Sequence, residues 1–421
     1  MNRPISPDDR WARRGKMKVS RRQFMMASTL AIPSLYPKKT ISISSRLRQK
    51  APALENAALD AWIELNLENM AWNLEKIRRQ VRVPVMAVIK ANGYGHGVVE
   101  VGRFLDESKI DALMVCRLSE AVRLREAGVK CPILNFGPLF PKDADILAGH
   151  DISQSVFTDQ VQILSQNAKN SRNKIKVHIH IDTGMGRMGI PYHEALPYIM
   201  NTAALEGLRV EGISTTLTED QEFDKVQMER FLTLCREAEK KGIRLGLKHA
   251  CSSAGIFTGK SFYLDMIRPG IVLYGYYPNQ KTQQEDHFSL KPVLQLKSRV
   301  AAVKNLLPGD SVSYHRVYKA TAKEKIAVVP VGYTDGYPFQ VVGKGFVLIK
   351  GQRFPVIGDI TANHLEVRLS LDSPVSIGDE VVLIGTQGSE RIPADEVADW
   401  AGISTYKILL RLNPLLPGVA F

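Results

Sequence analysis

The sequence Ala87-Val-Ile-Lys-Ala-Asn-Gly-Tyr-Gly-His-Gly97 takes an apolar run directly into a lysine and then into a glycine-rich turn. The apolar run is typical of a buried strand. A lysine at the carboxyl end of such a strand lies in a partly dry environment, where desolvation favours the neutral, nucleophilic amine. Lys90 is therefore a candidate for Schiff-base chemistry. The alternative, common for a lone lysine, is a side chain that reaches back to solvent.

The turn after Lys90 is suited to hold a small ligand. Gly93, Gly95 and Gly97 allow the backbone to approach a bound group closely, and Tyr94 brings a hydroxyl four residues after the lysine. The spacing is neither the dinucleotide-binding fingerprint nor a phosphate-binding P-loop. The sequence therefore predicts a site for a cofactor aldehyde at this turn.

Short apolar runs alternate with amphipathic stretches from about residue 60 to residue 290. The runs predicted as strands are 85–89, 112–115, 133–136, 175–181, 210–213 and 245–247. The stretches predicted as helices include 118–127, 159–168 and 224–241. This alternation predicts an α/β domain over 60–290 with a TIM-type (βα)8 barrel, and a doubly wound open sheet is the alternative. The barrel is favoured because candidate polar residues follow several different strands, where barrel enzymes carry their sites.

The pattern changes after Pro292, where short apolar runs are separated by Gly, Pro and Asp turns. The predicted strands are 298–303, 311–314, 326–331, 345–349, 365–369 and 380–384. Only 394–401 and 406–410 have a helical pattern. We therefore predict a C-terminal, mainly β domain over 291–421.

The positive charge of the chain is concentrated at its N-terminus. Of the formal net charge of +13, residues 1–50 carry +11 and the other 371 residues +2, so no nucleic-acid partner is expected. Ser20-Arg21-Arg22-Gln23-Phe24 precedes a short apolar run ending at Tyr36, the layout of a twin-arginine export signal. The run is too short for a stable membrane anchor. We expect a leader and basic linker over 1–50 on a periplasmic or otherwise exported protein. The alternative is a disordered basic tail on a cytoplasmic one.

The four cysteines are scattered, with none of the close pairing that a zinc site needs: Cys116, Cys131, Cys235 and Cys251. They are interpreted as small buried hydrophobic residues. We predict neither a metal site nor an obligatory disulfide.

Polar residues that could bind charged groups follow other predicted strands and recur in the β domain. They are Arg187 in the loop 182–189, Ser253 after the strand at 245–247, Arg268 with the N–H groups of Gly270 and Ile271, Tyr314, and the tyrosines of Gly332–Tyr337. Each has an ordinary explanation when taken singly. A loop arginine is usually a solvated surface group, and a tyrosine in a β domain usually packs in the core.

Together and in this order, the segments resemble the alanine racemase family of pyridoxal 5′-phosphate enzymes, from about Trp62 to Leu412. The resemblance rests on the loops 87–97 and 182–189, Arg268–Gly275, Ser313-Tyr314, Gly332–Tyr337 and Tyr406. It implies a βα barrel followed by a β domain, a head-to-tail homodimer and an amino acid as substrate.

The resemblance also implies a role for each matching residue. Lys90 would bind the cofactor covalently and act as one acid/base, while Tyr314 of the partner subunit would act as the other on the opposite face of the substrate. Arg268 would contact the pyridine nitrogen, where a permanently charged guanidinium keeps that nitrogen unprotonated. Arg187 would face the phenolic oxygen of the cofactor and the carboxylate of the substrate. Contacts to the cofactor phosphate would come from Tyr94, Ser253, Gly270, Ile271 and Tyr406, and Ala362 would contact the substrate.

The chain departs from the family pattern at His180, Thr216, Ser252 and Asn363. His180 replaces a lysine, often carbamylated, that orients the loop arginine, and bound chloride could substitute for the carbamate. Thr216 and Asn363 replace a histidine and the aspartate that bonds it, so a buried charge and its partner are lost together. Ser252 replaces an asparagine. Asn363 is similar to the residue found in exported broad-specificity racemases.

The expected function is a pyridoxal-phosphate-dependent racemase that interconverts L- and D-alanine, or serine or broader substrates, by two-base proton transfer. One alternative is a decarboxylase of the same architecture, although such enzymes place a carboxylate, and not an arginine such as Arg268, against the pyridine nitrogen. The other is a protein that binds the cofactor or an amino acid without turnover, as the four departures suggest.

Overall fold

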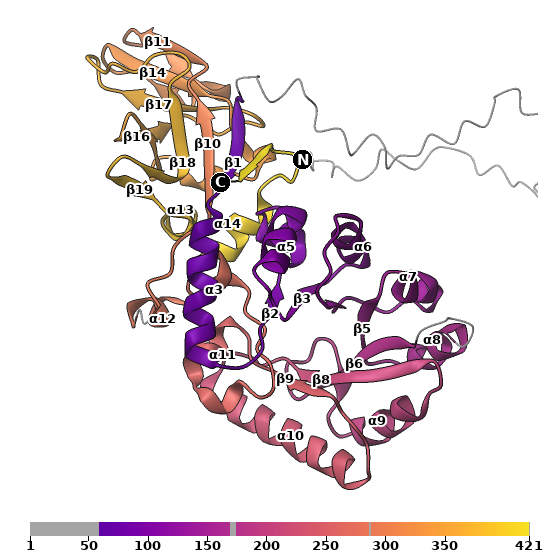
Figure 1. Ribbon diagram of the computed structural model, residues 1–421. Coiled ribbons are helices and arrows are strands. Elements are labelled where there is room, and N and C mark those ends of the chain that lie inside the picture. The colour runs from indigo at the N-terminus through magenta and orange to yellow at the C-terminus, as the bar shows by residue number, and fades with distance from the viewer. Residues whose placement is uncertain (1–58, 169–173, 286–287, 421) are drawn as a thin grey trace, which may run out of the picture. The chain divides into compact units, whose positions relative to one another are not determined.

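Parallel strands form a strongly curled sheet in the computed structural model, which describes residues 59–168, 174–285 and 288–420 (Figure 1). Seven strands follow one another in the order β2-β3-β4-β5-β6-β8-β9, and β7 pairs with β6 at the side. Their bounds are Met86–Val88 (β2), Ala112–Val115 (β3), Ile133–Asn135 (β4), Ile152–Val156 (β5), Ile175–Asp182 (β6), Ile190–Pro191 (β7), Leu208–Thr215 (β8) and Leu247–His249 (β9).

The segment 265–269 fills the eighth position and closes the barrel between β9 and β2. On one side Arg268 N donates to Cys251 O (2.7 Å), just after β9. On the other side Val88 N of β2 donates to Pro269 O (2.8 Å). The predicted (βα)8 barrel is therefore confirmed, and the open doubly wound sheet is not formed.

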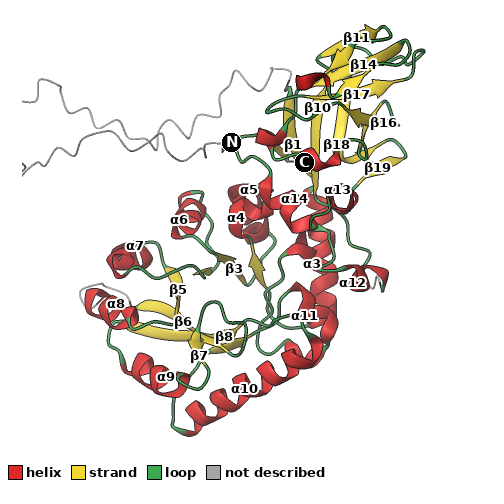
Figure 2. Cartoon of the chain, turned by 180° about the vertical axis from the view of Figure 1, so that it is seen from behind, coloured by secondary structure: helices red, strands yellow, loops and turns green. Residues whose placement is uncertain are grey.

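The helices after the strands surround the barrel (Figure 2). The helical segments of this part of the chain are Leu67–Val81 (α3), Lys90–Tyr94 (α4), Val98–Glu107 (α5), Leu118–Glu126 (α6), Ala144–Gly149 (α7), Gln160–Ala168 (α8), Ala195–Ala204 (α9), Gln221–Lys240 (α10), Ser253–Thr258 (α11) and Gln280–Gln284 (α12), with the 3₁₀ helices Pro141–Asp143 (η3), Lys260–Phe262 (η4) and Ile271–Tyr274 (η5). In α5 the residues that face the barrel, Val98, Val101 and Leu105, recur at helical spacing and are fully buried.

A sheet of mainly antiparallel strands forms the C-terminal β domain, in the order β11-β14-β17-β16-β15-β18-β10-β1-β20, with β19 paired to β18. The bounds are Ala61–Leu65 (β1), Leu294–Arg299 (β10), Ala302–Leu306 (β11), Glu324–Val329 (β14), Phe346–Ile349 (β15), Gln352–Ile357 (β16), Leu365–Leu369 (β17), Glu380–Gln387 (β18), Glu390–Ile392 (β19) and Gly418–Ala420 (β20). The ribbon Ser311–Val312 (β12) and Tyr318–Lys319 (β13), the 3₁₀ helices Tyr314–Arg316 (η6), Tyr333–Asp335 (η7) and Phe339–Val341 (η8), and the helices Ala394–Ala401 (α13) and Thr405–Arg411 (α14) complete it. The predicted mainly β domain is confirmed, and β1, which precedes the barrel in the sequence, pairs with β10 of this domain.

Some strands differ from the predicted ones. The single strand predicted over 298–303 is two strands, because Val300 N donates to Asp379 O while Ala301 N donates to Val328 O, so the chain changes neighbours between β10 and β11. β5 and β16 lie outside the predicted strands. β5 carries polar side chains that are nevertheless fully buried.

The predicted leader, residues 1–50, lies outside the described residues. Within the described residues, no helix combines the length and the apolar character needed to span a membrane. All four cysteines are free thiols. Burial raises the pKa of Cys131, Cys235 and Cys251 to about 12, so these thiols are protonated at neutral pH.

Candidate active site

Lys90 stands at the start of a tight left-handed turn. Ala91, Asn92, Gly93 and Tyr94 have φ angles between 53° and 63°. This conformation costs roughly 1–2 kcal/mol for each residue other than glycine. Such a turn persists only where the surrounding contacts fix it.

Close packing makes glycine necessary within this turn. A Cβ atom on Gly95, which has a φ angle of 82°, would lie 2.1 Å from the carbonyl oxygen of Leu409 in α14. Only glycine allows this approach, so the turn that carries Lys90 is packed directly against the C-terminal helix.

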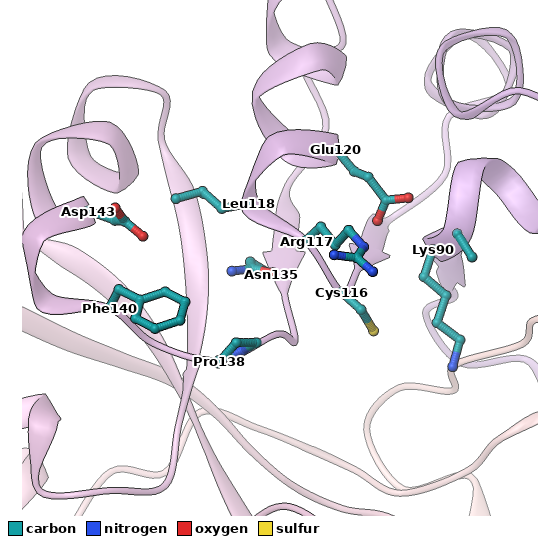
Figure 3. A pocket seen from close by; sticks show the side chains of 10 residues that line it. Lys90, Cys116, Arg117, Leu118, Glu120, Asn135, Pro138, Phe140 and Asp143 are labelled. Atoms are coloured by element: carbon teal, nitrogen blue, oxygen red, sulfur yellow. The ribbon is translucent and has the colours of Figure 1, made fainter. Parts of the chain in front are cut away.

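The Lys90 side chain borders a cavity of about 490 Å³ at the carboxyl ends of β2, β3 and β4 (Figure 3). The other lining residues are Ala91, Cys116, Arg117, Leu118, Glu120, Asn135, Pro138, Phe140 and Asp143. Lys90 is partly buried, and among the described residues its Nζ has no hydrogen-bond or ion-pair partner. The amine is therefore available to react with a group bound in the barrel mouth.

Four residues predicted to contact a phosphate meet beside this turn. The Tyr94 ring stacks on Tyr274 at 4.8 Å between centroids and lies 6.1 Å from the ring of Tyr406. A Cβ atom on Gly270 would lie 2.5 Å from Tyr94 Oη, and Gly270 N donates to Ser253 Oγ (2.9 Å). Burial raises the pKa of both Tyr94 and Tyr406, so their hydroxyls stay protonated and can donate to an anion.

The N–H group of Ile271, which begins η5, lies next to this cluster in the sequence and has no acceptor among the described residues. Backbone N–H groups at such a position can bind a phosphate. The structure thus brings together the five residues predicted to bind this group.

Arg268 is buried and is held by carbonyl oxygens and a histidine. Its Nη1 donates to His249 O (2.6 Å) and to His249 Nδ1 (2.7 Å), and its Nη2 donates to Thr215 O (2.7 Å) and Ala250 O (3.1 Å). Because a guanidinium only donates, His249 Nδ1 must accept, and its Nε2–H then donates to His178 Nδ1 (2.8 Å). Burial lowers the pKa of Arg268 to about 10, so it remains charged at neutral pH. Among the described residues nothing accepts from its Nε–H, which is free to meet a ligand.

The histidines around Arg268 are neutral. Burial, and then the charge of Arg268, lowers the pKa of His178 to about 4 and that of His249 well below its usual range. The same two causes, with the charge of Arg187, lower the pKa of His180 to about 3. The site therefore holds its arginine through neutral acceptors and not through a carboxylate.

Arg187 lies in the loop after β6 and is exposed. Among the described residues its guanidinium has no hydrogen bond, and the neutral His180, which bonds Ser214 Oγ at 3.0 Å, offers it no anion. The charges of Arg187 and Lys90 both act on the Cys116 thiol, which places the two cations near the same cavity.

Tyr314 and Ala362 do not join these residues within the chain. Both lie in the β domain, and the Tyr314 side chain is 73% exposed. Ala362 O accepts from Thr334 N (3.0 Å), and the neighbouring Asn363 Nδ2 donates to Thr334 Oγ1 (2.8 Å). The site in one chain therefore lacks the predicted second acid/base.

Three residues of the site were not predicted from the sequence: His178, His249 and Glu120. His178 precedes His180 by two positions in β6, so both side chains lie on the same face of the strand, which is a usable signal. His249 is the second residue after the predicted strand at 245–247. Glu120 gives no such signal, because an acidic residue in the first turn of a helix is common.

Known proteins resemble the whole described chain. The family model described as alanine racemase, N-terminal domain, matches residues 65–278, and the model described as alanine racemase, C-terminal domain, matches residues 293–420. The chain is 35% identical over 365 residues to alanine racemase 1 of Clostridium acetobutylicum, and 37% identical over 366 residues to the alanine racemase of Desulforamulus reducens. These alignments cover 85% of this chain and 94% and 98% of the relatives.

Solved structures agree with this result. The alanine racemase of Clostridium difficile 630 matches with a TM-score of 0.82 and 33% identity over 87% of this chain and 96% of that one. The alanine racemase of a D-cycloserine-producing Streptomyces lavendulae matches with a TM-score of 0.81 and 26% identity over 87% and 98% of the two chains. With both domains matched and more than a third of the aligned residues identical in sequence relatives, this chain belongs to the alanine racemase family.

Proposed function

We propose that this protein is a pyridoxal-phosphate-dependent racemase that interconverts L- and D-alanine. The observation that carries the proposal is the amine of Lys90, which has no partner among the described residues and borders the cavity at the barrel mouth on the same turn as Tyr94. The relatives named alanine racemase, at 35–37% identity, support alanine as the substrate.

The described residues fit the cofactor. Pyridoxal phosphate, when bound, supplies an aldehyde for a lysine amine and an electron sink that makes the α-hydrogen of an amino acid acidic. Tyr94, Tyr406, Ser253 and the N–H groups of Gly270 and Ile271 would hold its phosphate. Gly270 allows the backbone to lie beside the Tyr94 hydroxyl, since a Cβ atom there would be 2.5 Å from Tyr94 Oη, and this close approach supports the assignment. Arg268 Nε would donate to the pyridine nitrogen.

Two groups on opposite faces of the substrate must move the proton, because the reaction removes it from one face and returns it to the other. Lys90 Nζ would serve one face, and Tyr314 of the partner subunit the other. We infer a head-to-tail homodimer, because the 73% exposed Tyr314 side chain lies in the β domain and not at the barrel mouth of its own chain. Arg187 would bind the carboxylate of the substrate, and Ala362 of the partner subunit would contact it.

The alternatives have less support. A decarboxylase would need a carboxylate against the pyridine nitrogen, whereas the charged Arg268 stands in the predicted place. A protein that binds without turnover would not need Tyr314. A substrate screen by chiral chromatography tests serine and larger amino acids as further substrates.

Replacing Tyr314 with phenylalanine tests the two-base proposal. We expect kcat for racemisation in both directions to fall by about 10²–10⁴-fold, since one proton-transfer group is lost. Exchange of the α-hydrogen with deuterium oxide should persist for the one enantiomer whose hydrogen faces Lys90, as followed by nuclear magnetic resonance. Tyr192→Phe, an exposed tyrosine of the barrel, is the matched control. Unchanged racemisation by Tyr314→Phe would contradict the proposal.

We also infer that the protein is exported through its Arg21-Arg22 pair. Changing both arginines to lysine keeps the charge but removes the paired guanidinium groups, so the protein should stay in the cytoplasmic fraction on cell fractionation. Arg13 and Arg14 form a second arginine pair in the same leader, and their change to lysine is the control. Equal export of both variants would refute the inference.

A further inference from the structure

Glu120 is a buried carboxylate in the first turn of α6 that bonds the turn of another βα unit. Its side chain is 7% exposed, and its Oε1 accepts from the backbone N–H of Asn92 (2.8 Å). Its Oε2 is buried and has no partner among the described residues. Figure 3 shows the carboxylate beside the cavity that Lys90 borders.

The bond from Glu120 differs from the other hydrogen bonds of the turn, which are local. Gly93 N donates to Ile89 O (3.0 Å), Gly97 N donates to Asn92 O (2.9 Å), and Val98 N donates to Asn92 Oδ1 (3.1 Å). Within the described part of the chain, Glu120 is the one side chain from another βα unit that bonds the backbone of residues 91–94. It therefore ties the turn to the strand–helix pair β3–α6.

The turn needs such a tie because of its backbone conformation. Ala91 and Asn92 have φ angles of 53° and 54°, in the left-handed region that residues with a Cβ atom seldom adopt. Residues in this region keep it where surrounding contacts over-determine the chain. A carboxylate is a strong acceptor for a backbone N–H group. Lys90 directly precedes these residues, so the direction of its side chain depends on their conformation.

We propose that Glu120 is a positioning residue for Lys90, and that it acts by accepting the Asn92 N–H. The inference rests on the proposed function, since it assigns Glu120 to the reaction through Lys90. The bond itself is a property of the protein without cofactor, so it can be tested apart from catalysis.

Two substitutions separate the acceptor from the charge. Glu120→Gln keeps an oxygen at the Oε1 position and removes the charge. Glu120→Asp keeps the charge, but its side chain is shorter by one carbon–carbon bond, about 1.5 Å, so the carboxylate does not reach Asn92 N. Both residues are polar, and aspartate is favoured in the first turn of a helix, so both variants are suited to fold. Glu126→Gln, an exposed position of the same helix, is the control.

Hydrogen exchange of the Asn92 amide in cofactor-free protein is the first measurement. In Glu120→Asp the protection factor of the Asn92 amide is expected to fall about tenfold or more, because one hydrogen bond to a charged group is lost. In Glu120→Gln and Glu126→Gln most of this protection should remain. The second measurement is alanine racemisation at saturating pyridoxal phosphate. Glu120→Asp is expected to lower kcat about tenfold with a smaller change in KM, whereas Glu120→Gln is expected to keep kcat near that of the unchanged protein.

The outcomes decide between an acceptor and a charge. If Glu120→Gln loses as much exchange protection and kcat as Glu120→Asp, or if Glu120→Asp behaves like the unchanged protein, the positioning role is wrong. If hydrogen exchange gives the expected result but the unchanged protein does not racemise alanine, the proposed function is wrong. The hydrogen bond between Glu120 and Asn92 is then still supported. If Glu120→Asp does not fold, a loss of kcat and amide protection in the folded Glu120→Gln would still overturn the proposal.

Discussion

Replacing Lys90 with alanine is expected to abolish alanine racemisation, with kcat reduced by about 10⁴-fold or more. The substitution removes two contributions at once, because Lys90 both binds the cofactor covalently and moves the proton on one face of the substrate. The measurement is the formation of D-alanine from L-alanine, and the reverse, by chiral chromatography of the purified protein with added pyridoxal phosphate.

The exposed Lys142, close to the same cavity in η3, provides the matched control. Lys142→Ala should racemise alanine at the rate of the unchanged protein. Borohydride reduction of the loaded protein followed by peptide mapping should place the pyridoxyl group on residue 90. A Lys90→Ala variant that keeps most of its activity, or a map with the Lys90 amine unmodified, would remove the basis of the proposed function.

The barrel could be predicted because its strands are short apolar runs between amphipathic helices, as in the run that ends at Lys90. Two parts of the barrel, β5 and the closing segment 265–269, could not be predicted in this way. β5 has the sequence Ile152-Ser-Gln-Ser-Val156, and its Gln154 can be buried because Gln154 Nε2 donates to carbonyl oxygens and Asn135 Nδ2 donates to Gln154 Oε1. The closing segment 265–269 is not a regular strand, and only its hydrogen bonds to both neighbours identify it.

Some residues of the candidate site could likewise be predicted from the sequence, and others could not. Residues within a motif, such as Lys90, Tyr94 and Arg268, could be found from the sequence because the turn or strand that carries them has a recognisable pattern. The contact of Glu120 with Asn92 joins two residues that are 28 positions apart and lie in different βα units, so no local pattern predicts it. The structure of one chain does not bring the exposed Tyr314 into the site, because the role predicted for this residue requires a second subunit.

Lowering the pH from 7 to 5 is expected to destabilise the protein by several kcal/mol, because buried histidines must take up protons. Burial lowers the pKa of His96 and His178 to about 4 and that of His180 to about 3, and it lowers the pKa of His249 further below its usual range. In the unfolded chain each has an ordinary pKa of about 6.5. Between about pH 6.5 and pH 4 the unfolded state therefore binds more protons than the folded state.

The sign of the effect follows from this difference. The stability that the neutral histidines contribute is fully present above about pH 6.5, and it falls as the pH drops toward their folded pKa values, by about 1.4 kcal/mol per pH unit for each group. Four such groups can consume much of a typical unfolding free energy of about 5–15 kcal/mol by pH 5. Glu219, Asp224 and Glu366, whose pKa values burial raises, act in the opposite direction.

The measurement is urea unfolding of the cofactor-free protein at pH 7, 6 and 5. His180→Asn removes one titrating group while an amide can still bond Ser214, so it should reduce the pH dependence by about one proton. His193→Asn, at an exposed position of the barrel, is the matched control. An unfolding free energy that stays level between pH 7 and 5 in both the unchanged protein and His180→Asn would mean that these histidines already bind protons in the folded protein. His249 Nδ1 would then carry a proton and could not accept from Arg268 Nη1, which would leave the three backbone carbonyl oxygens as the acceptors that hold Arg268.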